Sequence, residues 1–259
     1  MRTIVSRQSD FNDGSETTVI LCHHVPMRDW KAYWNQASLT DRDSPFKQVG
    51  KTVNGIPIAG PQFDAIISDI RLRLALRRND VVLDLCCGNG IITYEISQYC
   101  KQVVGVDFSE PLIGAARARF QSKKIDYVVA DACALPSGIL SRRFDCIYMY
   151  EALQHFSTAQ LATLLDQSRT LPAPWPVVYF GSIPDAHRIR NFYNTPARWA
   201  EYERHIADGT EPIGHWWTRE ELVDVLNKCG FGVRFLDQNA LAHGTHYRFD
   251  ALCVPLGRV

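Results

Sequence analysis

The sequence predicts an α/β protein with an open, mostly parallel sheet, and two observations carry this prediction. Short runs rich in Val, Ile, Leu and Tyr recur at residues 81–85, 101–106, 127–130 and 144–150. Acidic residues stand at or just after three of these runs: Asp107, Asp131 and Glu151. The ligand crevice of such a sheet lies along the carboxyl ends of its strands, so we expect the acids to meet at one site.

The other elements follow from local signals. Helical periodicity predicts helices at 30–37, 63–76, 91–99 and 158–171. A long ordered loop is expected at 38–62, which is rich in Gly, Pro, Asp, Lys and Thr. Strands are predicted at 175–180, 231–237 and 246–254, and a short β-like stretch at 17–25.

The helix before the last two predicted strands has recognisable ends. Thr218 is a typical N-cap, and Glu221 stands at the reciprocal position of a capping box. Gly230 is a typical C-terminal stop. We therefore expect a helix from about residue 219 to Cys229.

Residues 81–90 (VVLDLCCGNG) predict a strand that enters a helix through a tight loop of small residues. Such a loop presents backbone N–H groups to a ligand, and its glycines allow close approach. Counted from Cys86 the spacing is C-x-G-x-G, with Ile91 where a dinucleotide fingerprint has its third glycine. Asp84 would repel a phosphate, so it suits a cationic ligand or a loop held by side-chain hydrogen bonds.

Asp107 is the best candidate for contact with a nucleoside. It follows Gly90 by 17 residues, about the length of one helix plus one strand. An acid at the tip of the second strand is placed to accept hydrogen bonds from both hydroxyls of a ribose. The alternative is that Asp107 and Asp131 only end strands and cap the next helices.

Four segments resemble, in order and spacing, the motifs of the class I S-adenosylmethionine-dependent methyltransferases: LDLCCGNG (83–90), GVDFSEPLI (105–113), VVADACALP (128–136) and FDCIYMYEALQHF (144–156). The resemblance covers about residues 60–254. It implies a Rossmann-like, doubly wound, seven-stranded, mostly parallel sheet with a reversed last hairpin strand, and S-adenosyl-L-methionine as the cofactor. Cys86 departs from the family, which most often has glycine there, but cysteine is small enough for such a loop.

The resemblance also implies a set of cofactor-binding residues at the strand ends: Asp84, Cys86, Gly88, Gly90, Asp107, Phe108, Asp131, Ala132 and Tyr150. Asp84 would lie near the methionine amino group, and Asp107 would bind the ribose hydroxyls. Phe108 would lie beside the adenine ring. Asp131 would accept from the adenine amino group, and the Ala132 N–H would donate to the ring.

Composition weighs against several classes of protein. Lys plus Arg and Asp plus Glu number 28 each, so the formal net charge is zero and a nucleic-acid partner is not expected. No apolar run reaches the roughly 20 residues of a membrane span, and no secretory signal begins the chain, so a cytoplasmic location is expected. The eight scattered cysteines predict reduced thiols. The run 22–24 (Cys-His-His) lacks a second ligand group, so no metal site is predicted.

The resemblance and the composition divide the chain into four parts. Residues 1–62 are expected to form an extension and cap, and residues 63–183 the S-adenosylmethionine-binding core. Residues 184–217, rich in His, Arg and Trp, would be a lid over the acceptor, the alternative being an ordinary surface helix. Residues 218–259 would complete the sheet. Four cap residues would close over the cofactor: Tyr33, Trp34, Gln48 and Lys51.

We expect methyl transfer to a small molecule, at oxygen, in secondary-metabolite or sugar biosynthesis. The lid arginines indicate an anionic or polyhydroxylated acceptor. Tyr150 and Glu151 would lie where the cofactor site meets the substrate. The alternatives are methylation of tRNA or protein, and a non-catalytic S-adenosylmethionine-binding module.

An alcohol acceptor needs a base, and histidine is the side chain best suited to that role near neutral pH. His155 is the first candidate, because it follows the fourth strand closely. His215, in the expected lid, is the second. His243 and His246, near the last hairpin, are weaker candidates.

Overall fold

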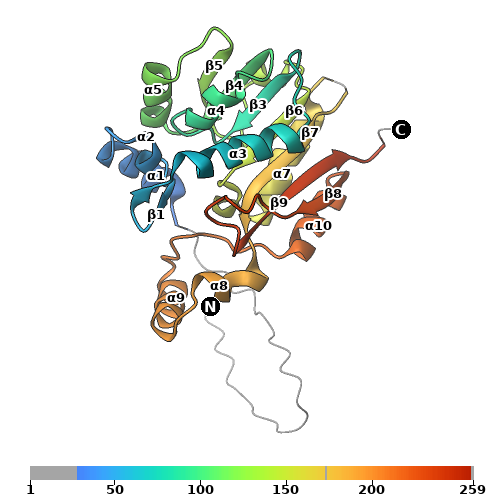
Figure 1. Ribbon diagram of the computed structural model, residues 1–259. Coiled ribbons are helices and arrows are strands. Elements are labelled where there is room, and N and C mark those ends of the chain that lie inside the picture. Colours follow the sequence, from blue (N-terminus) through green and yellow to red (C-terminus); the bar gives the residue numbers. More distant parts are fainter. Residues whose placement is uncertain (1–27, 173, 258–259) are drawn as a thin grey trace.

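The computed structural model describes residues 28–172 and 174–257; the expected β-like stretch at 17–25 and the Cys-His-His run lie outside them. Its main sheet has the order β5-β4-β3-β6-β7-β9-β8 (Figure 1). The strands are β3 (Val81–Leu85), β4 (Gln102–Asp107), β5 (Ile125–Val129), β6 (Cys146–Tyr150), β7 (Val177–Pro184), β8 (Phe231–Leu236) and β9 (Arg248–Pro255). Only β9 is reversed in direction: it pairs antiparallel with β7 and β8, whereas all other neighbouring strands of this sheet are parallel. The predicted seven-stranded sheet with a reversed hairpin strand is confirmed.

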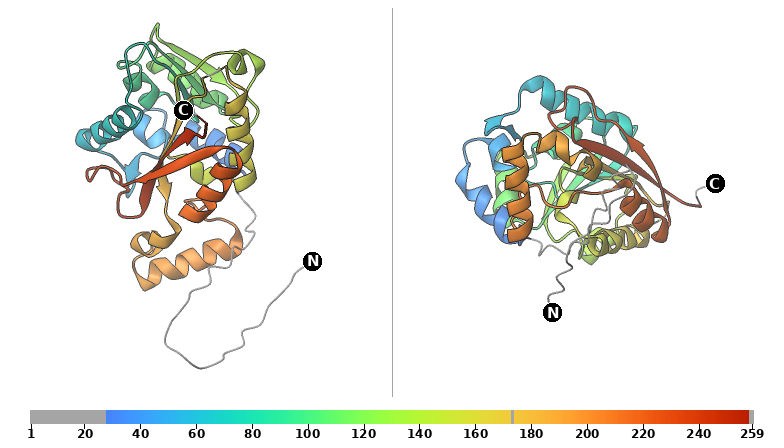
Figure 2. Two further views of the ribbon diagram at one scale, coloured as in Figure 1. Left: turned by 90° about the vertical axis from the view of Figure 1, so that its right-hand side faces the viewer. Right: turned by 90° about the horizontal axis from the view of Figure 1, so that it is seen from below.

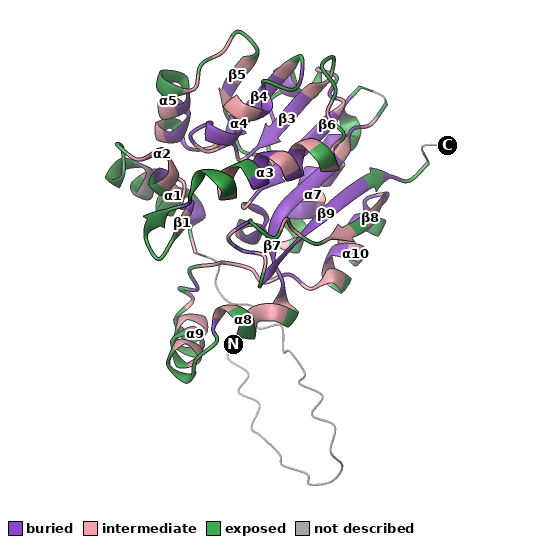
Figure 3. Cartoon of the chain, viewed as in Figure 1, coloured by how far each residue is buried: buried purple, intermediate pink, exposed green. Residues whose placement is uncertain are grey.

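Helices cover both faces of the sheet. The first face carries α3 (Gly60–Arg73), α4 (Ile91–Ile96) and α5 (Glu110–Arg119); Ile66, Ile70 and Ile96 pack there against Val82 and Tyr148. The second carries α6 (Ser137–Leu140), α7 (Thr158–Thr170) and α10 (Arg219–Lys228), whose leucines pack on the strands. Alternate strand residues thus bury opposite faces, as a doubly wound sheet requires. The central strands are almost wholly buried (Figure 3).

The segment between the first helix and the core differs from the sequence prediction. After α1 (Trp30–Thr40), the expected long loop contains the short helix α2 (Pro45–Gln48) and a two-stranded hairpin, β1 (Thr52–Val53) and β2 (Ile56–Pro57). Ser44 caps α2, and Pro45 begins it with a pre-set φ. A composition rich in Gly and Pro predicts a loop, whereas in this segment these residues form the turns and ends of very short helices and strands.

The helix of the last core segment is confirmed with its predicted ends. The Thr218 hydroxyl accepts from the Glu221 N–H, and the Glu221 side chain accepts from the Thr218 N–H, which completes the capping box. Gly230 takes a φ of +77° just after the helix. This capped helix lies against β8 and α7 and fixes the edge of the second face.

Residues 184–217 extend from the carboxyl end of β7 as a separate helical layer. They form η2 (Ala186–Arg188), α8 (Ile189–Phe192) and α9 (Pro196–Asp208), and two further views show α9 set apart from the sheet (Figure 2). No described residue of α9 is buried. The buried Glu211 carboxylate accepts from the Tyr193 hydroxyl at 2.8 Å and the Trp216 indole N–H at 3.3 Å, which ties the layer's aromatic side chains together.

Candidate active site

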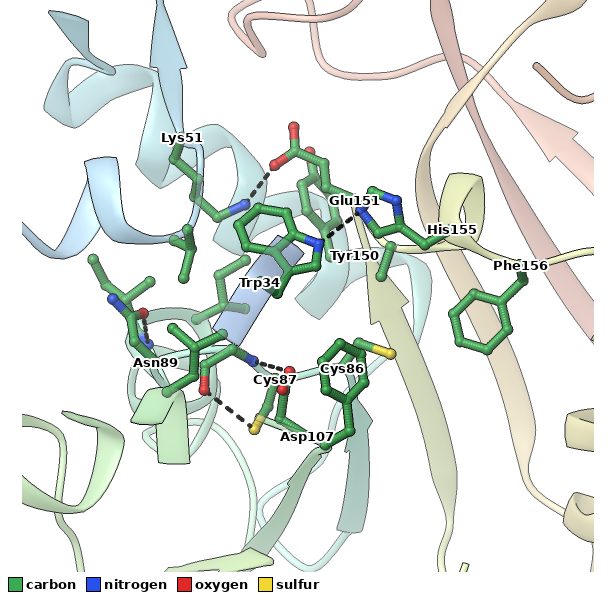
Figure 4. Close-up of a pocket in the computed structure, with 17 residues that line it drawn as sticks. Trp34, Lys51, Cys86, Cys87, Asn89, Asp107, Tyr150, Glu151, His155 and Phe156 are labelled. Carbon is green, nitrogen blue, oxygen red and sulfur yellow. Dashed lines mark hydrogen bonds and ion pairs between the residues drawn. The ribbon is translucent and has the colours of Figure 1, made fainter. Parts of the chain in front are cut away.

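A cavity of about 670 Å³, counted with its mouth, lies at the carboxyl ends of β3, β4 and β6. Its walls come from the loop after β3, the start of α5, the end of β6 and the N-terminal cap. Of the sequence-predicted site residues it brings together six: Cys86, Gly88, Asp107, Phe108, Tyr150 and His155. Glu151 also lines it, and Trp34 and Lys51 enter from the cap (Figure 4).

The loop after β3 has the backbone of a ligand cradle. Cys86, Gly88 and Gly90 have φ values of +59°, +57° and +79°, a region that favours glycine. This explains why cysteine at position 86 is unusual: the position carries backbone strain but leaves room for a thiol. Gly88 lies so close to the cap that a β-carbon there would be 3.0 Å from Val49.

Asp107 links this loop to β4. Its Oδ2 accepts from the Gly88 N–H and its Oδ1 from the Ser109 N–H, both at 2.9 Å. Each oxygen keeps one further acceptor position, and the side chain lines the cavity. Burial raises the pKa of Asp107 to about 6, so the group is mostly ionised at pH 7. The geometry suits a pair of neighbouring hydroxyls.

Asp84 lies behind the loop and does not line the cavity. Its Oδ2 accepts from the Thr93 hydroxyl at 2.6 Å and the Tyr148 hydroxyl at 2.5 Å. Burial raises its pKa to about 7. Of the two roles that the sequence left open, the structure shows a loop held by side-chain hydrogen bonds.

Gly90, Asp131 and Ala132 are likewise absent from the cavity wall. Gly90 is the N-cap of α4. Asp131 is exposed, and its Oδ1 accepts from the Cys133 N–H at 2.8 Å, which is the turn-forming alternative to adenine contact. Asp131 and Ala132 therefore remain sequence predictions for the adenine, and the described contacts do not add to them.

Glu151 contacts side chains from three distant parts of the chain. Its Oε2 accepts from Lys51 Nζ at 2.6 Å, and its Oε1 lies 3.0 Å from His243 Nε2 and 3.3 Å from Ser182 Oγ. Burial alone would raise the pKa of Glu151, but Lys51 and His243 outweigh it and hold that pKa well below the usual range. Lys51 and His243 therefore favour the ionised form of this carboxylate beside the cavity.

His155 lines the cavity, but its environment does not favour the base expected from the sequence. It packs on Trp30 with 4.0 Å between ring centroids, and its Nε2 accepts from the Trp34 indole N–H at 3.4 Å. Burial, with smaller contributions from Arg248 and Arg28, lowers its pKa to about 3. A base this weak does not take a proton near neutral pH. An indole N–H only donates, so Nε2 carries the lone pair and the hydrogen is on Nδ1.

His215 does not reach the cavity. Its Nε2 lies 3.7 Å from Glu221 Oε1, and its ring packs on Trp217. The lid arginines are also elsewhere: Arg190 covers the ring of Trp199, and Arg198 that of Phe192. Among the described residues, the expected lid at 184–217 thus contributes none to the cavity wall.

The N-terminal cap is fastened to the loop after β3 by the side-chain amide of Asn89. The Asn89 Nδ2 donates to the Pro45 carbonyl at 2.8 Å and to Gln48 Oε1 at 2.9 Å. Of the four cap residues expected over the cofactor, Trp34 and Lys51 line the cavity, and Gln48 acts through Asn89. Tyr33 packs against Trp34.

Among the described residues, no group of three or more His, Cys, Asp or Glu side chains is arranged to hold a metal ion. No helix in the same part of the chain has the length and apolar character needed to cross a membrane. The seven cysteines at described positions are free thiols.

Similarity to known proteins agrees with this geometry. Residues 82–174 match the model of a methyltransferase domain. An uncharacterized methyltransferase of Synechocystis sp. is 32% identical over 123 residues, which are 48% of this chain and 55% of that protein. A ubiquinone biosynthesis O-methyltransferase of Coxiella burnetii is 32% identical over 104 residues, 39% of this chain and 43% of that protein. The chain thus spans about half the length of these relatives.

The magnesium protoporphyrin IX methyltransferase of Synechocystis PCC 6803, solved with bound S-adenosylhomocysteine, shares the fold: the TM-score is 0.58 at 16% identity, over 87% of this chain and 97% of that one. The chain thus contains a methyltransferase domain at residues 82–174 and has the Rossmann-like fold of the class I S-adenosylmethionine-dependent methyltransferases. The matched domain supplies the loop after β3, Asp107 and Glu151, whereas Lys51 and His243 come from outside it.

Proposed function

We propose that the protein transfers a methyl group from S-adenosylmethionine to a small molecule, at oxygen. The observation that carries the proposal is the position of Asp107, a carboxylate at the end of β4 that lines the cavity. It accepts a hydrogen bond from the N–H of Gly88, in a loop whose residues have positive φ values. Asp107 would bind the ribose hydroxyls, and Phe108 would lie beside the base. When bound, the cofactor supplies an electrophilic methyl group on a sulfonium sulfur.

The protein's own contribution is binding and orientation. Asp107 and the loop would fix the nucleoside, while Trp34 and the cap would exclude water from the transfer. Lys51, a buried cation on the cavity wall, would attract the carboxylate of the cofactor's amino-acid end. The Coxiella relative is named an O-methyltransferase, which supports oxygen as the methylated atom.

Binding of S-adenosylhomocysteine, measured by calorimetry, tests the cofactor assignment. We expect saturable binding by the native protein and at least about tenfold weaker binding by Asp107→Ala, because hydrogen bonds to a charged group contribute about 1.5–3 kcal/mol each. The exposed Asp224→Ala is the matched control and should bind as the native protein does. Absence of binding by the native protein would rule the proposal out.

The class of acceptor is tested with S-adenosylmethionine labelled in its methyl group. Label should enter molecules below about 1 kDa of a cell extract and be stable to mild alkali, as an ether is. Label in tRNA or protein would show the macromolecular alternative. S-adenosylhomocysteine binding without any transfer would show a non-catalytic binding module.

A further inference from the structure

We infer that Asn89 is a positioning residue that holds the N-terminal cap closed over the cavity, and that it thereby sets how fast the cofactor enters and leaves. The cap consists of α1, α2 and the β1–β2 hairpin. The inference rests on the proposed function, because it takes S-adenosylmethionine as the occupant of the cavity. It adds a step, the opening of the cap, that the binding residues alone do not require.

The side chain of Asn89 belongs to the loop after β3 but is bonded to the cap. An asparagine amide has two donor hydrogens, and here one goes to the Pro45 carbonyl and the other to Gln48 Oε1, both in α2. Asn89 and Gln48 are only 1% and 4% exposed, so water hardly competes for these hydrogen bonds. The Asn89 amide group is therefore committed to the cap and leaves no donor for a ligand.

The backbone of the same loop is committed to the opposite side, where the nucleoside would bind. The Gly88 N–H donates to Asp107, which lines the cavity. Gly88 also packs so closely on Val49 of the cap that the loop and the cap cannot shift independently. A nucleoside on Asp107 would thus steady the short segment from which Asn89 holds α2.

The cap covers the cavity, so a ligand inside lies behind it. Trp34, Val49 and Lys51 line the cavity from the cap, and Figure 4 shows Trp34 and Lys51 on one side of it with Asp107 on the other. Helix α1 lies against α5, whose first turn contributes Leu112 to the same wall. Exchange of a ligand held between these walls requires the cap to move away from the core.

The other attachments of the cap lie on either side of α2 in the sequence and do not involve Asn89. The Lys51 ammonium pairs with Glu151 at 2.6 Å, and the buried Trp30 ring packs on His155 with 4.0 Å between centroids. Removal of the Asn89 amide should therefore leave the cap folded and attached, but open for a larger fraction of the time.

Binding kinetics of S-adenosylhomocysteine test the inference. Stopped-flow tryptophan fluorescence measures both rate constants, with Trp34 on the cavity wall as the reporter. Asn89→Ala should raise the association and the dissociation rate constant about tenfold each, the effect of losing its two hydrogen bonds to α2, and leave Kd within about twofold of the native value. Asn227→Ala, at an exposed position on α10, is the control and should change neither rate.

The two rate constants separate a residue that holds the cap from one that contacts the ligand. A closed cap slows entry and exit alike, whereas the loss of a ligand contact raises mainly the dissociation rate and weakens binding. A faster dissociation with an unchanged association rate would therefore overturn the inference.

Hydrogen exchange followed by mass spectrometry observes the cap itself. The Lys51 N–H donates to the Phe46 carbonyl and the Ile58 N–H to the Lys51 carbonyl, so opening of the cap exposes these amides. Peptides from residues 45–58 should exchange about tenfold faster in Asn89→Ala than in the native protein, and peptides from residues 219–230 should not change. Equal exchange of residues 45–58 in the two proteins would contradict the inference.

If Asn89→Ala does not fold, Gln48→Leu replaces it, because it removes one of the two acceptors from the cap and leaves the loop intact. Both rate constants should then rise about threefold. Failure of the native protein to bind S-adenosylhomocysteine would overturn the proposed function and this inference together. Native rate constants in the variant would overturn this inference alone.

Discussion

The phenol ring of Tyr127 fills the space beside Gly90 where a β-carbon would otherwise lie. Its hydroxyl donates to the Phe120 carbonyl at 3.0 Å, so the ring stays in that place. Ala116 of α5 closes the same space from the other side. Gly90 therefore joins the loop after β3 to α5 and β5 by close packing, although it does not line the cavity.

Gly90→Ala should lower the free energy of unfolding by about 2–4 kcal/mol, since it adds strain at positive φ to a collision with a fixed ring. Urea denaturation measures the change. Gly114→Ala is the control: Gly114 is a helical residue of α5 with open space around it, so alanine there should stabilise by about 0.5–1 kcal/mol. Equal effects of the two substitutions would contradict the packing argument.

The contribution of Asp84 to the stability of the protein should fall as the pH rises from about 4 to 7, opposite in sign to the contributions of His155 and Glu151, whose pKa values are lowered. Burial raises the pKa of Asp84 from 3.8 to about 7, so the folded state binds a proton that the unfolded state has lost. By linkage, the stabilisation is full below the unfolded pKa and is lost as the pH rises through the folded one. The loss is of the order of 4 kcal/mol at 1.36 kcal/mol per pKa unit.

Asp84→Asn should remove this contribution, which a comparison with the native protein by urea denaturation at pH 5 and pH 7.5 would measure. The exposed Asp224→Asn should leave it intact. The stability of Asp84→Asn should still depend on pH, because burial also raises the pKa of Asp107 and of Asp250 to about 6. An unchanged slope in Asp84→Asn would show that the carboxyl is not desolvated as described.

Lys51→Met should destabilise the protein by about 3–5 kcal/mol, because it leaves Glu151 buried without its closest cation. Glu151→Gln should also destabilise, and the double variant should lose less than the sum of the two. Thermal denaturation of the four proteins in a double-mutant cycle gives the coupling. If the stability lost by the double variant equals the sum of the losses of the two single variants, the 2.6 Å ion pair contributes no coupling energy.

His155 should remain neutral throughout the range from pH 5 to 8. Burial lowers its pKa to about 3, whereas an unperturbed imidazole titrates near 6.5. Its ring nitrogens should show a constant Nδ1–H tautomer in ¹⁵N NMR, with the signals assigned by their loss in His155→Ala. A titration of these signals between pH 5 and 8 would restore His155 as a candidate base.

The main sheet could be predicted from sequence because its signals are local and repeated. Each parallel strand is a short run of Val, Ile or Tyr, and Thr218 with Glu221 encodes a helix start within four residues. The cap could not be predicted in detail. Its two-residue strands and four-residue helix are shorter than the windows in which periodicity can be recognised.

The sequence indicates the position of a cavity residue where one strand end determines it, but not the contacts between distant segments of the chain. Asp107 follows from its position at the end of β4. The cluster around Glu151 joins Lys51, 100 residues away in sequence, to His243 in the loop before β9, and no spacing rule connects them. The burial that lowers the pKa of His155 likewise depends on Trp30 and Trp34, which only the folded cap brings near.

Three non-glycine residues with left-handed backbones stand along one edge of the sheet: Cys86, Glu151 and Ser182. Glycine at any of them would relax the backbone and remove a side chain from the cavity or its immediate support. A laboratory selection for heat resistance alone would therefore tend to accumulate glycines at this edge. The resulting variants would fold well and lose their ligands, so an engineering programme for this protein needs a binding screen beside its stability screen.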